Sequence, residues 1–472
     1  MQDRLQWGGR FAGTPDAALL AFGSSLEEDL LLAPFDVATS RAHVSALEAG
    51  AIVDARVARD LRGALDAVAR EVADGSFAAF ARASGAEDVH GAIDARVREL
   101  APEAGAWLHA GRSRNDQVAT TLALYVRDRA ERGAALAVAI AREALAQAFA
   151  ALRDETLLAA TTHWQPAQPI LLAFWLEALA ESFARAVERF DRVAAGAREL
   201  CPLGSGACSG TTLPLDRAVA ARELGFAEPS RNALDAIGNR DLALDLLHAV
   251  ARALGAASRA SEEIVLWSAP AFGYVRLADE ASTGSSLMPQ KRNPDPFELV
   301  RAHAAGANGA LAAALGTTTG LGLSYHRDLQ ETKALVIAAT ERGLGALDAF
   351  ARALRYIQWN GPAMTLRAAD GFTVATDVAD ALVLRGVTPR RAHELVGAAV
   401  ANAERAARAL STADLHALAR EASLGEALDA PLDALASVRA KRTAGSTAPS
   451  RVADAISALE AVLAARERNL ST

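Results

Sequence analysis

The positions of the prolines constrain the fold of this chain more than any other feature of its sequence. The 472 residues contain 16 prolines, yet none lies in the windows 35–101, 103–165, 170–201, 230–269, 297–361 and 390–430. These windows are rich in Ala, Leu, Arg and Glu, which favour helices, whereas a proline would break a helix interior. Aromatic residues total only 5%. The sequence therefore predicts an all-α protein with long helices.

Several of these predicted helices are apolar on more than one face. In the segment 241–267, Leu247, Val250 and Leu254 form a stripe with helical spacing, and much of the remaining surface is apolar too. The segment 118–155 has the same character. Helices of this kind are usually buried on several sides. We therefore expect a long helical bundle that extends across subunits.

Glycine and proline clusters predict where the chain divides into domains. Such clusters lie near residues 111 and 360. They indicate an N-terminal helical domain (1–111), a central helical bundle domain (112–360) and a C-terminal helical domain (361–472).

Composition narrows the functional class. The net charge is −8 and no strongly basic segment is present, which argues against a nucleic-acid partner. The N-terminal residues lack the apolar region of a secretory signal, and no apolar run approaches the ~18 residues of a membrane span. We expect a cytoplasmic protein that binds neither nucleic acid nor membrane.

The sequence offers no recognisable metal or nucleotide site. The two cysteines, Cys201 and Cys208, fit no zinc or redox spacing. The glycine-rich segment 202–210 misses the dinucleotide-binding spacing, so we interpret it as a turn. No HExxH motif or P-loop occurs, and a catalytic metal is not expected.

The stretch 282–300 runs from a serine-rich loop into a helix. Asp295 is a suitable N-cap, Pro296 suits the first helical position, and Glu298 stands where a capping box places a glutamate. One interpretation is therefore structural: Glu298 caps a helix, and the loop is a surface turn.

The second interpretation of this stretch is catalytic, and the residues alone leave both open. Ser285 lies on a glycine-containing loop that could close over a substrate. Lys291 and the amides of the loop could stabilise an anion, as could the N-terminus of the helix that follows.

Three further polar stretches have similar alternatives. Ser113 and Asp116 predict the start of a long helix, where the neighbouring Arg114 and Asn115 could bind a carboxylate or simply face solvent. Thr162 and His163 stand in a polar loop between helical segments. A lone histidine is usually structural, but a polar loop favours a functional role more than an apolar face would. Tyr325, Gln330 and Lys333 form a polar patch that, without context, is a solvated face.

Taken together, these stretches resemble a known family. The segment "GSSLMPQKRNPD" resembles the signature loop of the fumarase/aspartase superfamily, and "SRNDQ", "THWQPAQP" and "YHRDLQETK" resemble regions of its argininosuccinate lyase branch. Further similar segments, which extend the likeness over essentially the whole chain in order, are 7–11, 87–94, 202–217, 370–387 and 445–452.

This resemblance implies a fold, an activity and an assembly. It implies a homotetramer whose central helices form a long bundle, with each active site built from three subunits. The implied reaction is the reversible elimination of argininosuccinate to L-arginine and fumarate through an aci-carboxylate intermediate, a step of arginine biosynthesis. No cofactor is implied.

The resemblance also implies catalytic roles. Ser285 takes the place of the general base, and His163 that of a candidate proton donor to the leaving guanidinium, with Glu298 as its charged partner. Lys291 takes the place of the lysine that stabilises the anion, and Asn293 that of a carboxylate contact.

The remaining implied site residues bind the substrate. Those implied to hold the succinyl part or its carboxylates are Ser25, Ser113, Arg114, Asn115 and Thr162. Those implied to hold the arginine portion are Tyr325, Gln330 and Lys333. His90 takes the place of a further active-site histidine.

The chain departs from the family pattern at positions beside these residues. His326 stands where Asn is usual, Trp164 and Pro166 replace more usual residues beside His163, and Ala281 stands where an aromatic residue is common. Pro270 and Ala271 stand where an acidic residue is common. These departures bear on substrate affinity and loop packing rather than on the type of reaction.

Two competing functions remain open from the sequence. A related fumarate-releasing lyase, such as one acting on adenylosuccinate, would need phosphate-binding groups, whereas Arg114 and the Tyr325, Gln330 and Lys333 set favour a guanidino amino acid. A non-catalytic structural homologue is the other alternative, since fold does not guarantee activity. The full set of catalytic candidates argues against it.

Overall fold

Helices form most of the chain in the computed structural model, which describes residues 16–370 and 372–470. The strands in this described part are short and occur as three two-stranded pairs. The all-α prediction is therefore confirmed. The segment 7–11, which contributes to the family resemblance, lies outside the described residues.

The chain contains two compact units. The described residues of the first unit are 16–135, 186–254 and 303–345; those of the second are 136–185, 255–302, 346–370 and 372–470. The boundaries between the units fall inside five long helices, which are α8 (Arg114–Arg153), α9 (Leu172–Gly196), α12 (Asp241–Ser268), α13 (Asp295–Thr318) and α14 (Leu329–Leu354).

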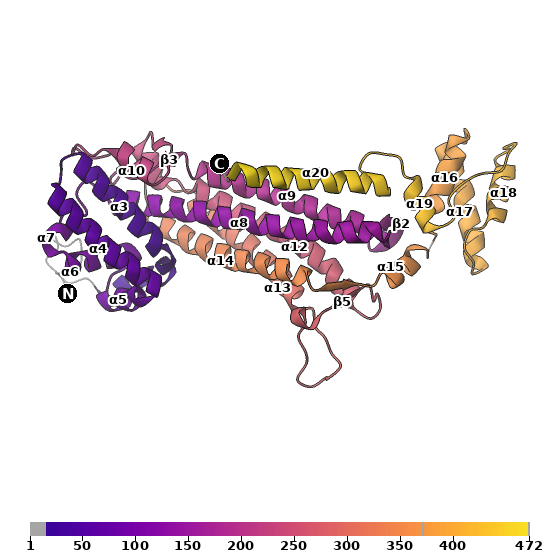
Figure 1. Ribbon diagram of the computed structural model, residues 1–472, viewed down its shortest axis with the longest axis horizontal. Coiled ribbons are helices and arrows are strands. Elements are labelled where there is room, and N and C mark those ends of the chain that lie inside the picture. The colour runs from indigo at the N-terminus through magenta and orange to yellow at the C-terminus, as the bar shows by residue number, and fades with distance from the viewer. Residues whose placement is uncertain (1–15, 371, 471–472) are drawn as a thin grey trace. The chain divides into compact units, whose positions relative to one another are not determined.

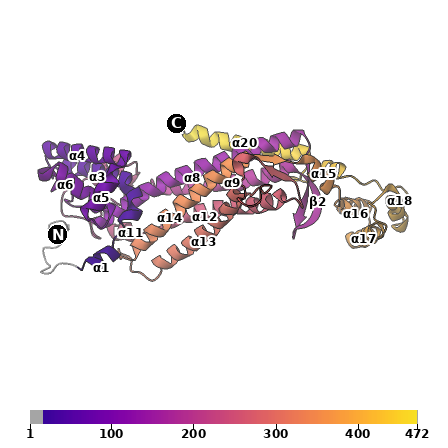
Figure 2. The same ribbon diagram turned by 90° about the horizontal axis from the view of Figure 1, so that it is seen from below.

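The N-terminal helices of the first unit pack around α3 and α4, as Figure 2 shows. Helix α4 begins at the N-cap Asp54, whose carboxylate accepts a hydrogen bond from the amide of Val57 at 2.8 Å. The elements here are α1 (Ala17–Phe22), α2 (Leu26–Asp29), η2 (Leu30–Leu32), α3 (Ala33–Ala49), α4 (Ala55–Asp74), α5 (Ser76–Ser84), α6 (Val89–Leu100) and α7 (Pro102–Gly105).

The segment of the first unit that contains α10 packs against α3 and α8. A core cluster that includes Ala42, Leu124, Leu203 and Phe226 joins α3 and α8 to α10 and its flanking segments. The elements here are the parallel pair β3 (Leu200–Cys201) and β4 (Glu228–Pro229), with α10 (Arg217–Glu223) and α11 (Ala233–Gly238).

Close helix packing in the first unit depends on a small residue. A Cβ atom at Gly343 on α14 would lie 2.4 Å from Cγ1 of Val250 on α12, so glycine permits the two helices to approach. Leu247, Val250 and Leu254 are fully buried, which confirms the apolar stripe predicted for this segment.

In the second unit, two antiparallel strand pairs accompany the long helices. The pairs are β1 (Leu157–Thr162) with β2 (Gln165–Leu171), and β5 (Val275–Leu277) with β6 (Ile357–Trp359). A tryptophan cluster lies beside β6: the rings of Trp175 and Trp267 are 4.9 Å apart, and those of Trp175 and Trp359 are 5.9 Å apart. The Trp175 indole donates a hydrogen bond to Glu263 at 2.7 Å, so its polar edge is satisfied.

The C-terminal helices of the second unit have their own apolar core. Val378, Leu395 and Leu418 are buried together between α16, α17 and α18, which lie side by side in Figure 1. The helices of this region are α15 (Gly361–Ala368), α16 (Ala375–Leu384), α17 (Pro389–Arg405), α18 (Thr412–Glu421), α19 (Ala434–Ala440) and α20 (Pro449–Leu470). The short helix η3 (Asp279–Ala281) comes earlier in the chain, between β5 and α13.

Helix α8 corrects one expectation from composition. By length and apolar content it passes the test for a membrane span, although no such run was expected from the sequence. In its most apolar window, 44% of the residues are buried. The core helix of a folded domain passes the same test, so length and composition alone do not assign α8 to a membrane.

Candidate active site

The start of α8 is held by its own cap and by the glycine-rich segment. Asp116 accepts a hydrogen bond from the amide of Ser113 at 2.9 Å, and Ser113 accepts one from the amide of Asn115 at 3.2 Å, which confirms the predicted helix start. The second carboxylate oxygen of Asp116 accepts hydrogen bonds from the amides of Gly204 and Gly206, each at 2.9 Å.

The glycine-rich segment 202–210 is therefore a turn, as predicted, but one with a defined partner. Gly204 and Gly206 adopt positive φ angles, which lets both amides point at one carboxylate. Burial raises the pKa of the Asp116 carboxyl, although the three amides and Arg112 oppose this shift. Asn115 also contacts this segment, because its side-chain amide donates to the carbonyl of Ala207 at 3.0 Å.

Lys333 is buried, which excludes the alternative that its patch is simply a solvated face. Its ammonium lies 2.6 Å from a carboxylate oxygen of Asp29, and the two side chains are 6% and 0% exposed. The other oxygen of Asp29 accepts a hydrogen bond from the hydroxyl of Ser25 at 2.7 Å. Asp29 thus brings together two of the predicted binding residues. Sequence reasoning missed it, although the Ser25–Asp29 spacing of four is a helical one.

Five of the predicted site residues line one small cavity in the first unit, here called the polar cavity. Its volume is about 40 Å³. The predicted residues in its wall are Ser25, Arg114, Tyr325, Gln330 and Lys333, and the others are Glu87, Asp88, Val118, Arg240, Arg327 and Leu329. This space has room for a water molecule but not for an amino acid, so a substrate would have to displace part of the wall.

Ionisable groups around the polar cavity are perturbed by burial and by one another. Burial raises the pKa of the Tyr325 hydroxyl, and the positive charges of Arg327 and Arg240 partly offset this shift. Asp88 is buried as well, yet Arg114 holds the pKa of its carboxyl below the usual range. The Arg114 Nε atom lies 3.2 Å from that carboxylate.

His90 lies in the core of the first unit. Its side chain is fully buried, and its Nδ1 atom is 2.9 Å from a carboxylate oxygen of Asp36. The same oxygen accepts a hydrogen bond from Gln117 on α8 at 2.8 Å. Although burial favours protonation, His90 and Arg112 hold the pKa of Asp36 well below its usual range. His90 therefore belongs to a charged network beneath the start of α8.

Thr162 and His163 lie at the tip of the β1–β2 hairpin rather than between helical segments, which corrects the predicted setting. His163 and Trp164 have φ angles of 54° and 59°. This conformation is typical of a two-residue hairpin turn with the twist of antiparallel strands, and is uncommon for residues other than glycine. Thr162, His163 and Trp164 are exposed. The hairpin thus presents the imidazole to the surface of the chain.

The loop 282–294, visible in Figure 1 between β5 and α13, carries the predicted base. Paired backbone hydrogen bonds between Thr283 and Asn293, at 2.8 and 3.2 Å, join the two ends of this loop. The hydroxyl of Ser285 accepts hydrogen bonds from the amides of Leu287 and Met288, at 3.2 and 3.1 Å. Such donors favour negative charge on the oxygen.

The capping box predicted at the start of α13 does not form in the described residues. Helix α13 begins at Asp295, and the amides of Phe297 and Glu298 donate to the carbonyl of Pro294. The Asp295 carboxylate instead accepts a hydrogen bond from Thr283 across the loop base. Glu298 is consequently not engaged in capping, and its carboxylate lies 3.8 Å from Arg301.

The predicted site residues thus fall into two sets. Those of the first unit are Ser25, His90, Ser113, Arg114, Asn115, Tyr325, Gln330 and Lys333. Those of the second unit are Thr162, His163, Ser285, Lys291, Asn293 and Glu298. Within the described part of the chain, no hydrogen bond or ion pair joins His163 to Glu298.

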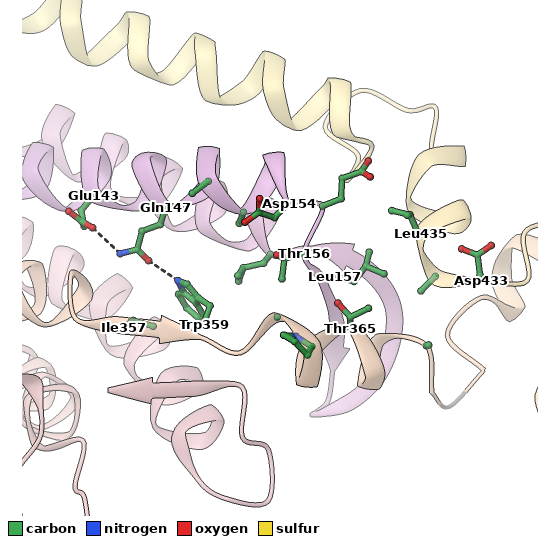
Figure 3. Close-up of a pocket in the computed structure, with 18 of the residues that line it drawn as sticks. Glu143, Gln147, Asp154, Thr156, Leu157, Ile357, Trp359, Thr365, Asp433 and Leu435 are labelled. Carbon is green, nitrogen blue, oxygen red and sulfur yellow. Dashed lines mark hydrogen bonds between the residues drawn. The ribbon is translucent and has the colours of Figure 1, made fainter. Parts of the chain in front are cut away.

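A larger cavity in the second unit contains none of these residues. Its volume is about 1010 Å³, and it lies between the end of α8, β6, α15 and α19 (Figure 3). Gln147 in its wall donates to Glu143 at 2.9 Å and accepts from the indole of Trp359 at 2.8 Å. The larger cavity is therefore not the one that the predicted site residues line.

No group of three or more His, Cys, Asp or Glu side chains in the described ranges is arranged to hold a metal ion. Cys201 is buried and Cys208 exposed, and both are free thiols. The predicted site residues offer hydroxyl, imidazole, carboxylate, amide and cationic groups.

Comparisons with known proteins find relatives over nearly the whole chain. Residues 9–309 match a family model described as Lyase, and residues 372–439 one described as Argininosuccinate lyase C-terminal. An argininosuccinate lyase from Mycolicibacterium paratuberculosis is 41% identical over 467 residues, which cover 98% of this chain and 97% of that relative. One from Deinococcus deserti is 39% identical over 456 residues, with 96% and 97% coverage.

Solved structures show the same fold. An EDDS lyase variant with bound fumarate has a TM-score of 0.80 and 26% identity, covering 97% of this chain and 94% of that one. A class II fumarase from Schistosoma mansoni has a TM-score of 0.68 at 16% identity, with 86% and 91% coverage, and therefore supports the fold alone.

Proposed function

This chain belongs to the argininosuccinate lyase family, and we propose that it catalyses the reversible cleavage of argininosuccinate to L-arginine and fumarate, a step of arginine biosynthesis. The observation that carries the proposal is the polar cavity. There, Ser25, Arg114, Tyr325, Gln330 and Lys333 meet although they lie far apart in the sequence. Their charges and hydrogen-bonding groups suit a ligand with both carboxylate and amino groups.

Ser285 is the proposed general base. The reaction begins by removing a proton from a carbon next to a carboxylate, which is a very weak acid. A serine is a poor base unless negative charge on its oxygen is stabilised. The two amides that donate to the Ser285 hydroxyl support this role, since they would stabilise the same oxygen as an alkoxide. Closure of the loop 282–294 would bring it to the substrate.

The doubly negative intermediate needs several hydrogen-bond donors and cationic groups around it. A single preorganised donor contributes roughly 2.7–4 kcal/mol of transition-state stabilisation, and general-base catalysis about 10²–10⁴-fold in rate. We assign the partners to Lys291 and Asn293 on the loop and to Ser113, Asn115 and Thr162. The exposed ammonium of Lys291 is available for this role.

His163 is the proposed donor of the second proton. As the bond between the succinyl carbon and the guanidinium nitrogen breaks, the electron pair of the lost C–H bond forms the double bond of fumarate, and the leaving nitrogen gains a proton. Glu298 is the proposed charged partner of this imidazole. Its freedom from helix capping supports this assignment.

We propose that the active protein is a cytoplasmic homotetramer in which three subunits contribute to each active site, and that each chain has the three domains 1–111, 112–360 and 361–472. The exposure of His163 and Glu298 on the single chain supports a shared site, as does the half-buried position of Ser285. A catalytic group on the surface of one subunit needs a neighbouring subunit to cover it and exclude water.

The proposed function is tested by following fumarate absorbance with argininosuccinate as substrate. We expect turnover by the wild type and a loss of about 10²-fold or more in Ser285→Ala, with substrate binding still measurable by calorimetry. His163→Asn should lower turnover too, whereas Ser286→Ala, the control on the same loop, should retain far more activity than Ser285→Ala.

Three results would contradict these assignments. Near-normal turnover by Ser285→Ala would remove that residue from the role of base. Fumarate release from adenylosuccinate, but not from argininosuccinate, would assign the chain to a different lyase. Inactivity towards both substrates would indicate a non-catalytic homologue.

A further inference from the structure

The charges around the polar cavity do not balance. Its wall contains four cationic side chains, and three of them have a carboxylate partner. The pairs are Arg114 with Asp88 at 3.2 Å, Arg327 with Glu87 at 3.4 Å, and Lys333 with Asp29 at 2.6 Å.

Arg240 is the fourth cation, and its partners are neutral. It immediately precedes α12, and its residue is only 5% exposed. Its Nη1 atom donates to the carbonyls of Ile237 at 3.2 Å and Asn239 at 2.7 Å. Its Nε atom is buried without an acceptor. Among the described residues, no carboxylate oxygen lies within 4.0 Å of its guanidinium nitrogens.

The nearest carboxylate in sequence is otherwise engaged. Asp241 follows Arg240 directly, but its carboxylate accepts a hydrogen bond from the side chain of Asn239 at 3.5 Å. Burial lowers the pKa of the Arg240 guanidinium to about 10, so the side chain remains charged at neutral pH. The first unit therefore holds a buried positive charge that has no counter-charge.

Such an arrangement favours an anion in the adjoining space. A buried charge without a partner is destabilising, and the charge-to-charge attraction is stronger here than in water because the surroundings are less polar. An anionic group that enters the polar cavity would offset the charge of Arg240. The attraction acts through space, so it does not require contact with the buried Nε atom.

We propose that Arg240 is a specificity-determining residue that selects a substrate carrying an α-carboxylate on its amino-acid portion. The inference rests on the proposed function, in which Tyr325, Gln330 and Lys333 hold the arginine portion. Arg240 lines the same cavity as these three residues. Of the substrate's carboxylates, the one on the arginine portion is therefore the one that this charge selects.

The test compares two amines in the reverse reaction, in which fumarate is consumed. L-arginine and L-argininamide have nearly the same shape, but only L-arginine carries the carboxylate charge. We expect the wild type to prefer L-arginine. In Arg240→Gln, the ratio of kcat/KM for L-arginine over L-argininamide should fall by roughly 10-fold or more, mainly through the KM for L-arginine. Arg240→Lys keeps the charge and should retain part of the preference.

Arg252→Gln is the matched control. Arg252 lies on α12 as well, but it is exposed and outside the wall of the polar cavity. The same change of charge there should leave the preference for L-arginine at its wild-type value. A ratio that falls equally in both glutamine variants would indicate a general effect of net charge and would overturn the inference.

The outcomes separate this inference from the proposed function. If the wild type consumes no fumarate with L-arginine, the proposed function fails. If the wild type is active but Arg240→Gln and Arg240→Lys lower the rates with both amines by the same factor, Arg240 has a purely structural role and the inference fails. A selective loss with L-arginine, partly restored by lysine, supports it, because misfolding would not distinguish the two amines.

Discussion

His43 should make the folded protein sensitive to mild acid. The side chain is fully buried on α3, and its Nε2–H donates a hydrogen bond to the carbonyl of Ala110 at 3.0 Å. The other ring nitrogen, Nδ1, is buried without a partner. Burial, together with the positive charge of Arg112, places the pKa of His43 well below its ordinary value. The folded state therefore keeps this imidazole neutral.

The size of the effect follows from proton linkage. In the unfolded chain His43 titrates near its ordinary pKa of about 6.5, so below that pH the unfolded state binds a proton that the folded state refuses. The stabilising contribution is complete above about pH 6.5 and is lost as the pH falls. At about pH 5.5, one unit below, it amounts to a loss of about 1.4 kcal/mol.

The assay is urea unfolding of the wild type and of His43→Gln at about pH 7.5 and pH 5.5, at one fixed protein concentration. Glutamine can donate to the Ala110 carbonyl but does not titrate. Other groups also respond to acid, so the quantity of interest is the difference between the two proteins. The wild type should lose about 1.4 kcal/mol more of its unfolding free energy than the variant. Equal losses would refute the reasoning.

Three further single substitutions and one double variant test the packing of the protein. Asp29→Asn should destabilise the protein by about 3–5 kcal/mol, because it leaves the buried ammonium of Lys333 without a counter-charge. Urea unfolding measures this loss, and the double variant with Lys333→Gln should recover part of it. Full stability of the single variant would contradict the prediction. Gly238→Ala places a Cβ atom 2.2 Å from the carbonyl oxygen of Leu323, so it should lower the thermal midpoint by an amount equivalent to about 1–3 kcal/mol. Gly255→Ala, with open space around its Cβ, should raise it instead, and the same sign for both would be inconsistent with a steric cause.

The helices and their starts could be predicted from the sequence because the signals for them are local. A helix requires a run without proline, a sufficient share of helix-forming residues and a polar cap, and all three lie within a few residues of one another. The start of α8 at Arg114, with Ser113 and Asp116 in place, was predicted on this basis. Local signals failed at α13, where Asp295 bonds to Thr283 across the loop instead of capping its own helix.

The candidate site was only partly predictable, for a similar reason. The loop 282–294 could be identified because its serine, lysine, asparagine and prolines are unusual for this chain. His163 was also identified as a candidate, but its place at a hairpin tip was not predicted. Strand pairing depends on a partner segment, which the residues around His163 do not reveal. Arg240 gave no local signal, and Asp29 gave only its helical spacing from Ser25, since each is an ordinary charged residue when read alone.

The sequence by itself determined that the chain is helical, where the long helix α8 begins and which loop carries the proposed base. Only the tertiary structure decided that Lys333 is buried against Asp29 and that Arg240 has no counter-charge. The physical reason is that helix propensity and capping act between neighbours in the chain. The environment of a charge, in contrast, depends on which distant segments surround it and exclude water.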